Sequence, residues 1–237
     1  MRIVVVSDTH TQHEELGTVT ADVLIHCGDA CDGFRRDPAD VDRLDDWFSR
    51  QRVDLVLAIG GNHDFEMERR ARASLPVFSH AVYLQDRCHE YQGCRFYGAP
   101  WTPELMAWAF FQDSKAIREK WAAVPSDIDV LITHTPPYGI LDRNRHNHSL
   151  GCHDLLDRLP AIRPRLHVFG HTHASAGTAW HGSTLHVNAS MVNSRYAIAH
   201  KPIEIELAVG SRSPATLVGH GLTELSQRCL AGGEALP

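Results

Sequence analysis

The chain has 237 residues, of which 43% are hydrophobic and 22% charged, and these values are ordinary for a globular protein. They exclude disorder, a collagen-like repeat or a coiled coil over most of the chain. Its 23 Lys and Arg residues against 29 Asp and Glu residues give a formal net charge of −6. A net acidic chain binds a phosphate backbone poorly, unless metal ions supply positive charge locally.

Apolar segments in this chain are short. None approaches the roughly 18 consecutive apolar residues of a membrane span. The run Ile3–Val6 is also too short for the hydrophobic region of a signal peptide. We therefore expect a cytoplasmic protein without a membrane partner. The sequence does not indicate an oligomeric state.

In chain order, apolar runs alternate with segments that resemble helices. Each run is rich in Val, Ile and Leu and is followed at once by Gly, Asp, Asn or His. This pattern is typical of strands that are buried on both faces and carry polar residues at their carboxyl ends. The runs are Ile3–Ser7, Val23–Cys27, Leu55–Ile59, Val130–Thr133 and His167–Phe169.

Between these strands the sequence predicts four helices: Asp40–Gln51, Phe65–Ala73, Pro103–Ala123 and Gly151–Leu159. In the longest of them, Trp108, Phe111 and Trp121 are expected to be core anchors.

Two hairpins are also predicted. One lies in Ala81–Gly98, with a turn at Gln92-Gly93, and the other joins Ala176–His181 to Thr184–Asn188. Ile203–Leu207 alternates as a strand does.

The chain contains no Pro- or Gly-rich linker, so residues 1–207 are predicted to form a single domain. Residues 208–237 form a C-terminal extension that we expect to be partly irregular, with a candidate short helix at Leu222–Leu230.

Candidate metal ligands follow all five buried strands. Residues i and i+2 of an extended segment face the same way. Asp8 and His10 can therefore reach one ion, and His171 and His173 can project into one pocket. The candidates are Asp8, His10, Asp29, Asn62, His134, His171 and His173.

These side chains predict two adjacent divalent cations as cofactors. Imidazole, carboxylate and amide oxygen together suit Mn, Fe, Zn or Co more than Ca or Mg. A bridging carboxylate allows two cations to sit ~3.5–4 Å apart. Asp29, which stands alone after its strand, is the natural bridge. The choice among Mn, Fe and Zn stays open.

The order of the motifs resembles the calcineurin-like metallophosphoesterase superfamily. Any one motif can be explained as a turn former, but that explanation accounts for one or two strand ends and not for five. The motifs are Asp8-Thr9-His10, Gly28-Asp29, Gly61-Asn62-His63-Asp64, the lone His134, and Gly170-His171-Thr172-His173. Tyr97–Trp101, Thr133–Pro137 and Leu166–Gly170 look like segments of the small metallophosphoesterase-domain-containing phosphodiesterase group.

The resemblance implies an α/β fold, namely a four-layer α/β/β/α sandwich with the metal site at the C-terminal ends of its strands. It also implies two ligand sets. One metal would be held by Asp8, His10, Asp29 and His173, and the other by Asp29, Asn62, His134 and His171.

The implied reaction is hydrolysis of phosphodiester bonds in small substrates by a hydroxide that bridges the metals. Two cations would neutralise the phosphate and lower the pKa of a shared water. His63, as imidazolium, would donate to the departing oxygen, which is worth ~10²–10⁴-fold. Asp64 would orient the His63 ring. Cyclic nucleotides are the first substrate class to consider.

Further residues are candidates for substrate binding. Trp101 lies on a Pro-rich turn, where it could stack on a nucleobase or fill the core. A polar stretch after Pro136-Pro137 could form a wall that faces the substrate or a solvated loop. Its candidates are Arg143, Arg145, His146 and His148.

Other functions stay open. The nearest is a phosphomonoesterase. A nuclease is disfavoured because the acidic chain has no basic stripe, so nucleic acid is not an expected partner. A metal-stabilised binding protein is the third alternative. The segment Gly28–Gly33 lacks the Asp-Arg-Gly arrangement of protein Ser/Thr phosphatases, which disfavours that class.

Overall fold

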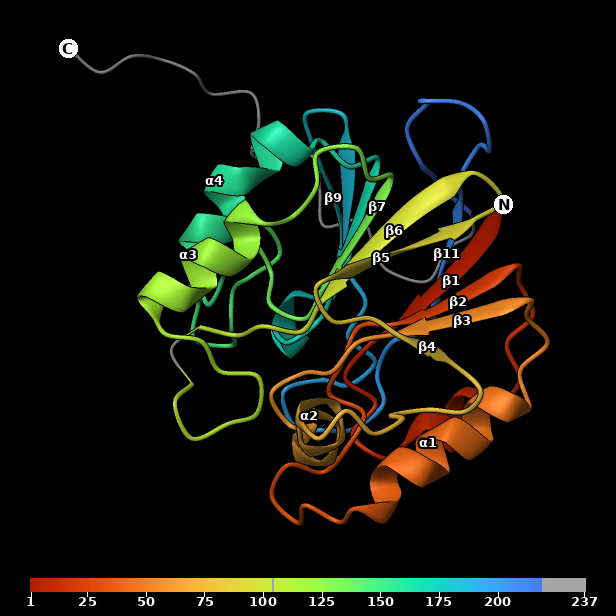
Figure 1. The fold of residues 1–237 in the computed structure, drawn as a ribbon, viewed down its shortest axis with the longest axis vertical. Coiled ribbons are helices and arrows are strands. Elements are labelled where there is room, and N and C mark those ends of the chain that lie inside the picture. The colour runs from red at the N-terminus through yellow and green to blue at the C-terminus, as the bar shows by residue number, and fades with distance from the viewer. Residues whose placement is uncertain (104, 219–237) are drawn as a thin grey trace.

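The computed structural model describes residues 1–103 and 105–218, and two six-stranded sheets form its centre (Figure 1). The first sheet has the order β12-β11-β1-β2-β3-β4. Its strands are β1 Arg2–Val6, β2 Val23–His26, β3 Leu55–Ala58, β4 Val82–Tyr83, β11 Ile203–Glu206 and β12 Thr216–Leu217. β1 to β4 run parallel, and β11 and β12 add antiparallel pairs at one edge.

The second sheet has the order β5-β6-β7-β8-β10-β9. Its strands are β5 Arg87–Tyr91, β6 Cys94–Ala99, β7 Val130–Thr133, β8 Leu166–Phe169, β9 Gly177–His181 and β10 Thr184–Asn188. The four central strands are parallel, and β5 and β9 close the sheet as antiparallel edge strands. Both predicted hairpins are therefore present, as β5–β6 and β9–β10.

Helices cover the outer faces of both sheets. The α-helices are α1 Ala39–Ser49, α2 Phe65–Arg72, α3 Ser114–Ala122 and α4 His153–Ile162, and two short 3₁₀ helices cover His13–Leu16 and His173–Ser175. In Figure 1, α1 and α2 lie beside the first sheet, and α3 and α4 lie beside the second. This arrangement confirms the predicted four-layer α/β/β/α sandwich. None of the described helices is long and apolar enough to cross a membrane.

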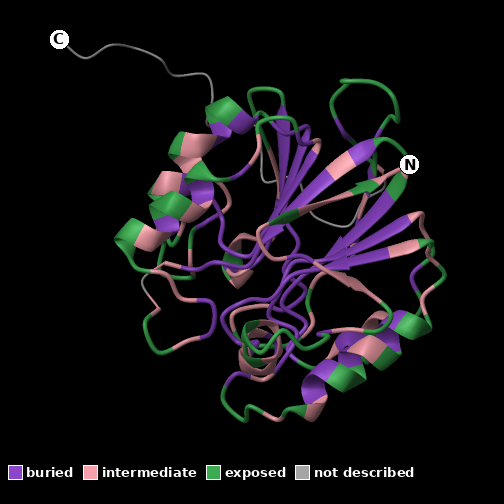
Figure 2. Ribbon diagram, viewed as in Figure 1, coloured by how far each residue is buried: buried purple, intermediate pink, exposed green. Residues whose placement is uncertain are grey.

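Alternating side chains build a core on each face of the sheets, and the inner strands are almost wholly buried, whereas the edge strands are partly exposed (Figure 2). On β1, Ile3 and Val5 belong to the cluster between the sheets, whereas Val4 and Val6 belong to the cluster that includes the helices. Such double-faced burial explains why the parallel strands appear in the sequence as continuous apolar runs.

The predicted helix Pro103–Ala123 is wrong over its first half. The Asp113 side chain accepts hydrogen bonds from the backbone of Lys115 and Ala116, so α3 begins only at Ser114. In the preceding loop, Phe110 has a φ of +54°, and its N–H donates to Glu68 Oε1 over 2.9 Å. The Ala109 N–H donates to the Asn62 carbonyl over 3.1 Å. The backbone of Ala109 and Phe110 is thus hydrogen-bonded to Asn62 and to Glu68 of α2 and not in a helical pattern.

The described part of the predicted C-terminal extension contacts the sheets. β12 pairs with β11. The buried Arg165 donates from Nε to the Ser213 carbonyl over 2.6 Å and from Nη2 to the Ala208 carbonyl over 2.9 Å. The candidate helix Leu222–Leu230 lies outside the described residues.

Candidate metal centre

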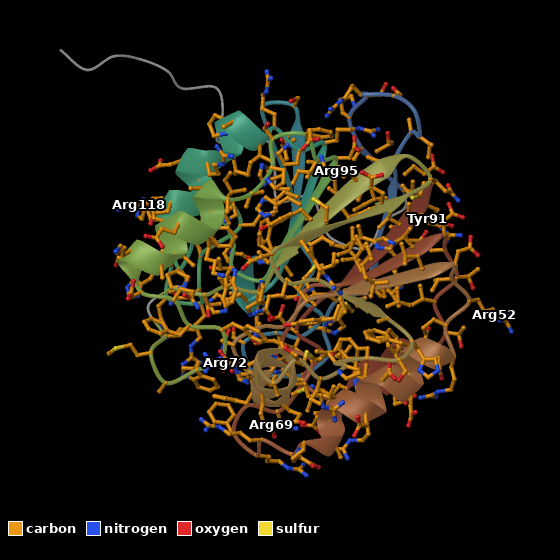
Figure 3. The ribbon with its side chains drawn as sticks, in the orientation of Figure 1. Arg52, Arg69, Arg72, Tyr91, Arg95 and Arg118 are labelled. Carbon is orange, nitrogen blue, oxygen red and sulfur yellow. The ribbon has the colours of Figure 1, made fainter. Side chains whose placement is uncertain are left out.

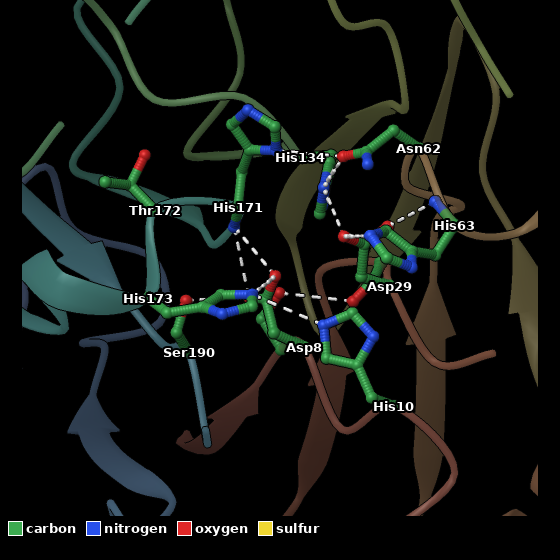
Figure 4. A network of polar contacts seen from close by, with 12 residues as sticks. Asp8, His10, Asp29, Asn62, His63, His134, His171, Thr172, His173 and Ser190 are labelled. Carbon is green, nitrogen blue, oxygen red and sulfur yellow. Dashed lines mark hydrogen bonds and ion pairs between the residues drawn. The ribbon is translucent and has the colours of Figure 1, made fainter. Parts of the chain in front are cut away.

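The carboxyl ends of β1, β2 and β3 in one sheet and of β7 and β8 in the other meet at one end of the sandwich. The loops are joined directly, because the Asp8 N–H donates to the Gly28 carbonyl over 2.9 Å and the Gly170 N–H donates to the His134 carbonyl over 3.1 Å. All seven predicted ligands are gathered here (Figure 4). The topology, with parallel strands ending at a common edge, is what brings them together.

The first donor group consists of Asp8, His10 and His173. Their ligand atoms all lie within 4.8 Å of one another. His173 Nε2 is 3.3 Å from Asp8 Oδ1 and 3.3 Å from His10 Nε2. Only one hydrogen fits between these two Nε2 atoms. At least one of them is therefore unprotonated and has a lone pair that a metal ion could accept.

The second donor group consists of Asp29, His134 and His171, again within 4.8 Å of one another. Asn62 joins it, with Oδ1 2.9 Å from His171 Nδ1 and 3.0 Å from His134 Nε2. Asp29 Oδ2 is 3.3 Å from His134 Nε2. The two donor groups therefore bring together the residues of the two ligand sets that the resemblance implies, except that Asp29 belongs to the second group alone. The bridging role of Asp29 stays a prediction.

The lone pairs of the second group converge on one point. His134 Nδ1 is 2.8 Å from the Cys27 carbonyl, which can only accept, so this nitrogen carries a proton. In neutral His134 the lone pair is then on Nε2, where it faces the oxygens of Asn62 and Asp29. Such converging lone pairs repel one another unless a positive charge lies between them, which is the condition that a metal ion satisfies.

Electrostatics favour positive charge in the same place. Burial opposes a charge on His134, but the Asp29 carboxylate outweighs it and raises the pKa of His134 to about 9. Burial alone would raise the pKa of Asp29, yet His134 and His63 hold that pKa well below its usual range. Burial lowers the pKa of His10 and His171 to about 4, so both rings are neutral near pH 7 and offer lone pairs. The residues present therefore fit two divalent cations.

Several ligands sit on strained backbone. The φ angles of Asp8, His10, Asp29 and His171 are +53°, +42°, +54° and +68°, in the left-handed region that residues other than glycine seldom adopt. Such a conformation costs on the order of 1–3 kcal/mol and persists only when the surroundings impose it. Beside them, a Cβ on Gly61 would collide with Asp29 Oδ1 and lie 2.6 Å from His134 Cε1. The loops are thus shaped to aim these side chains.

Ser190 supports the first donor group. Its Oγ donates to Asp8 Oδ2 over 2.7 Å, and the His171 N–H donates to Asp8 Oδ1 over 3.0 Å. Both bonds fix the carboxylate so that its remaining lone pairs point at His10 and His173. Hydrogen-bond partners of this kind typically contribute 10–100-fold to metal affinity.

We expect Ser190→Ala to weaken Mn²⁺ binding by about 10- to 100-fold, because the Asp8 carboxylate loses the donor that orients it. Isothermal titration of metal-stripped protein measures the effect. Ser126→Ala, at an exposed serine, is the matched control and should leave the affinity unchanged. Equal affinities for wild type and Ser190→Ala would contradict this role for Ser190.

His63 stands beside the second donor group, with Nε2 3.9 Å from Asp29 Oδ2. The Gly33 N–H donates to His63 Nδ1 over 3.3 Å. A Cβ on Gly33 would lie 2.7 Å from that nitrogen, so the close approach requires glycine. Since Nδ1 accepts, the neutral ring carries its proton on Nε2, toward the metal ligands. The imidazolium form expected from the sequence stays a prediction.

The expected contact between Asp64 and the His63 ring is wrong. Asp64 Oδ2 accepts from the N–H groups of Asp29 and Gly61 over 2.8 and 2.7 Å, and Oδ1 accepts from Cys31 N–H over 2.9 Å. Burial and the nearby Asp29 carboxylate raise the pKa of Asp64 to about 7. Asp64 thus ties the loop after β2 to the loop after β3 and positions Asp29, whereas Gly33 orients His63.

A cleft of about 590 Å³ opens over the metal centre. Of the predicted substrate-binding residues, Arg145 and His146 line it, whereas Arg143 and His148 are not among its lining residues. Arg143 Nη1 instead donates to the Asn147 carbonyl over 2.9 Å.

Trp101 does not reach the cleft. It is buried, its Nε1 donates to Asp86 Oδ1 over 2.6 Å, and Lys120 Nζ lies 4.1 Å from the centre of its ring. Stacking of Trp101 on a substrate is therefore a wrong prediction, and the alternative of a core residue is correct.

Three aromatic residues around His63 were not found from the sequence: Trp108 and Tyr196 line the cleft, and Phe34 packs beside them outside its lining. The ring centres of Trp108 and His63 are 4.6 Å apart, and the ring centres of Tyr196 and His10 are 4.8 Å apart. Phe34 packs on His63 at 5.5 Å. Trp108 was expected in the core. No motif marks Phe34 or Tyr196, since each lies in a loop whose path depends on tertiary contacts.

The sequence matches known proteins over most of its length. A model of the calcineurin-like phosphoesterase family matches residues 1–175. Metallophosphoesterase domain-containing protein 1 of Homo sapiens and its Mus musculus counterpart are each 33% identical over 233 residues, which cover 87% of this chain and 71% of theirs.

Solved structures share the fold at low sequence identity. A dimetal phosphatase from Danio rerio has a TM-score of 0.55 and 10% identity, over 92% of this chain and 98% of its own. Phosphopantetheinyl hydrolase from Mycobacterium tuberculosis has a TM-score of 0.54 and 15% identity, over 82% of this chain and 90% of its own.

Proposed function

The chain belongs to the calcineurin-like phosphoesterase family, and from this premise we propose that it is a two-metal phosphodiesterase acting on small substrates, with cyclic nucleotides the first class to try. The observation that carries the proposal is the presence of two donor groups, the second of which contains Asp29 and adjoins His63, under one cleft. Diester preference is supported by the resemblance of Tyr97–Trp101 and Thr133–Pro137 to the small phosphodiesterase group.

Two cations, with Mn²⁺ as the proposed working ion, would neutralise the phosphate and lower the pKa of a water that attacks phosphorus. Asp8, His10, Asp29 and His173 would hold one of them, and Asp29, Asn62, His134 and His171 the other. Asp64 and Ser190 keep the two carboxylates in place by their hydrogen bonds.

His63 would act on the departing oxygen. Because Gly33 occupies Nδ1, the proton on Nε2 faces the region of Asp29 where the phosphate would bind. A hydrogen bond from Nε2 to the leaving oxygen stabilises the negative charge that develops there as the P–O bond breaks. The exposed Arg145, on the cleft wall, supplies a cation for the remaining phosphate oxygens.

The test is hydrolysis of an aryl phosphodiester and the matching monoester by metal-stripped protein, with and without Mn²⁺. We expect turnover only with metal, and a higher kcat/KM for the diester. A preference for the monoester would identify a phosphomonoesterase and overturn the proposed substrate class. Absence of turnover with two metals bound would overturn the proposed enzyme activity and favour a binding protein.

The surface charge gives no support to a nuclease. Arginines that project from the surface in Figure 3 pair with acidic neighbours: Arg69 with Glu66, Arg72 with Glu68 and Arg118 with Asp154, over 2.6 to 3.0 Å. Such pairs neutralise charge locally, whereas binding along a phosphate backbone needs a stripe of cations. Activity on small diesters that is insensitive to salt is the expected result.

A further inference from the structure

We propose that the cleft selects phosphoesters whose departing alcohol carries a flat aromatic group, which binds against Trp108 and Tyr196 in the cleft and against the neighbouring Phe34. We call these three residues the aromatic rim. The proposal rests on the proposed function, since it assigns the substrate class of the same site.

The aromatic rim surrounds His63. Ring centres of Trp108, Phe34 and Tyr196 lie 4.6, 5.5 and 6.0 Å from the His63 ring. Phe34 meets Trp108 edge-on, at 5.4 Å and 88°, and lies 6.5 Å from Tyr196. Because His63 is the group that would face the departing oxygen, rings around it contact the leaving group and not the retained ester.

These rings are exposed to an unusual degree. Phe34 is 71% exposed and Tyr196 is 42% exposed, although both pack against residues of the site. Met106, in the same loop as Trp108, is 83% exposed. Exposed aromatic surface of this kind marks a binding site when polar groups adjoin it. Here the adjoining groups are the metal ligands.

The backbone holds the rim in place. Tyr196 has a φ of +59°, which costs energy in a residue other than glycine. Its N–H donates to the Asn193 carbonyl over 2.9 Å, and its carbonyl accepts from Gln12 Nε2 over 3.0 Å. Gly33 leaves no room for a Cβ, which would lie 2.8 Å from Trp108 Cζ3. Strained backbone and close packing together present the two rings toward the cleft.

Polar residues line another part of the cleft. Arg145 and His146 come from the loop between β7 and α4, and Arg145 Nε is 3.0 Å from His146 Nε2. A charged or strongly polar leaving group would lose hydration against the aromatic rim without gaining a partner there. A flat apolar ring would gain stacking, which we expect to raise affinity about 10-fold or more.

The first experiment measures binding without turnover. Phenylphosphonate and methylphosphonate are titrated into Mn²⁺-loaded protein, and we expect the phenyl compound to bind at least about 10-fold tighter. Trp108→Leu and Tyr196→Leu should each remove most of this preference. Trp180→Leu, at an exposed tryptophan of β9, should retain it. The proposal would be overturned if wild type bound phenylphosphonate and methylphosphonate equally well. It would also be overturned if the preference for phenylphosphonate survived in both the Trp108→Leu and the Tyr196→Leu variant.

The second experiment measures turnover with two methyl diesters, one with an aryl and one with a fluoroalkyl leaving group of similar acidity. We expect kcat/KM for the aryl ester alone to fall about 10-fold in the Trp108→Leu and Tyr196→Leu variants. If neither ester is cleaved while the phenyl preference persists, the proposed function fails and the aromatic subsite stands. If both are cleaved equally well and the variants behave alike on them, the subsite fails and the proposed function stands.

Discussion

Replacing Asp29 by alanine is expected to abolish metal-dependent hydrolysis, with kcat/KM reduced by on the order of 10³-fold or more. Several kcal/mol of charge stabilisation would depend on the cations, and Asp29 is the carboxylate that we propose bridges them. Its Oδ2 faces His134, and its Oδ1 accepts from the His63 N–H over 2.7 Å. The change therefore disturbs the second donor group and the loop that carries His63.

Metal content is measured alongside activity for this variant. We expect Asp29→Ala to bind fewer than two Mn²⁺ per chain under conditions that saturate wild type. Asp157→Ala, at an exposed aspartate of α4, controls for the loss of a carboxylate and should keep both metals and full activity. An Asp29→Ala protein that folds and retains wild-type turnover would show that the donor groups are not the catalytic centre.

The second large effect is expected at His63. His63→Gln should lower kcat by ~10²–10⁴-fold, the range for loss of a proton or hydrogen-bond donor at the leaving group. Metal content should remain at the wild-type value, because His63 belongs to neither donor group. The loss should be smaller for substrates with better leaving groups, since these need less assistance.

His181→Gln provides the control, because His181 is an exposed histidine on β9. It should not alter kcat. If His63→Gln instead released metal and left the kcat of the remaining loaded protein unchanged, His63 would be a structural residue of the loop and the assignment of its chemistry would be lost.

The sequence predicted which side chains gather in the two donor groups because their signal is local. A continuous apolar run followed by Asp, Asn or His marks a parallel strand and its carboxyl end, and parallel strands of one sheet end together. Asp8 and His171 were found this way. Their positive φ angles could not be found, because they depend on hydrogen bonds between loops distant in the chain.

The residues around the ligands were predicted less well. Asp64 and Trp101 have residue types that suit the roles expected of them, yet the fold gives Asp64 backbone partners and gives Trp101 the Asp86 carboxylate. Conversely, Gly33 orients the His63 ring through its backbone N–H. Because nearly every residue has this group, the residue type could not indicate the role. Trp108 lies at a spacing typical of a helix, but its loop is held away from helical geometry by hydrogen bonds to Asn62 and Glu68.

The central claim is that two metal ions bind on either side of Asp29. Crystals of the protein grown with Mn²⁺ and measured at a wavelength where manganese scatters anomalously test this directly. The account predicts two anomalous peaks, one within the group Asp8, His10 and His173, and one within the group Asp29, His134 and His171. A single peak, or peaks away from Asp29 at saturating Mn²⁺, would contradict it.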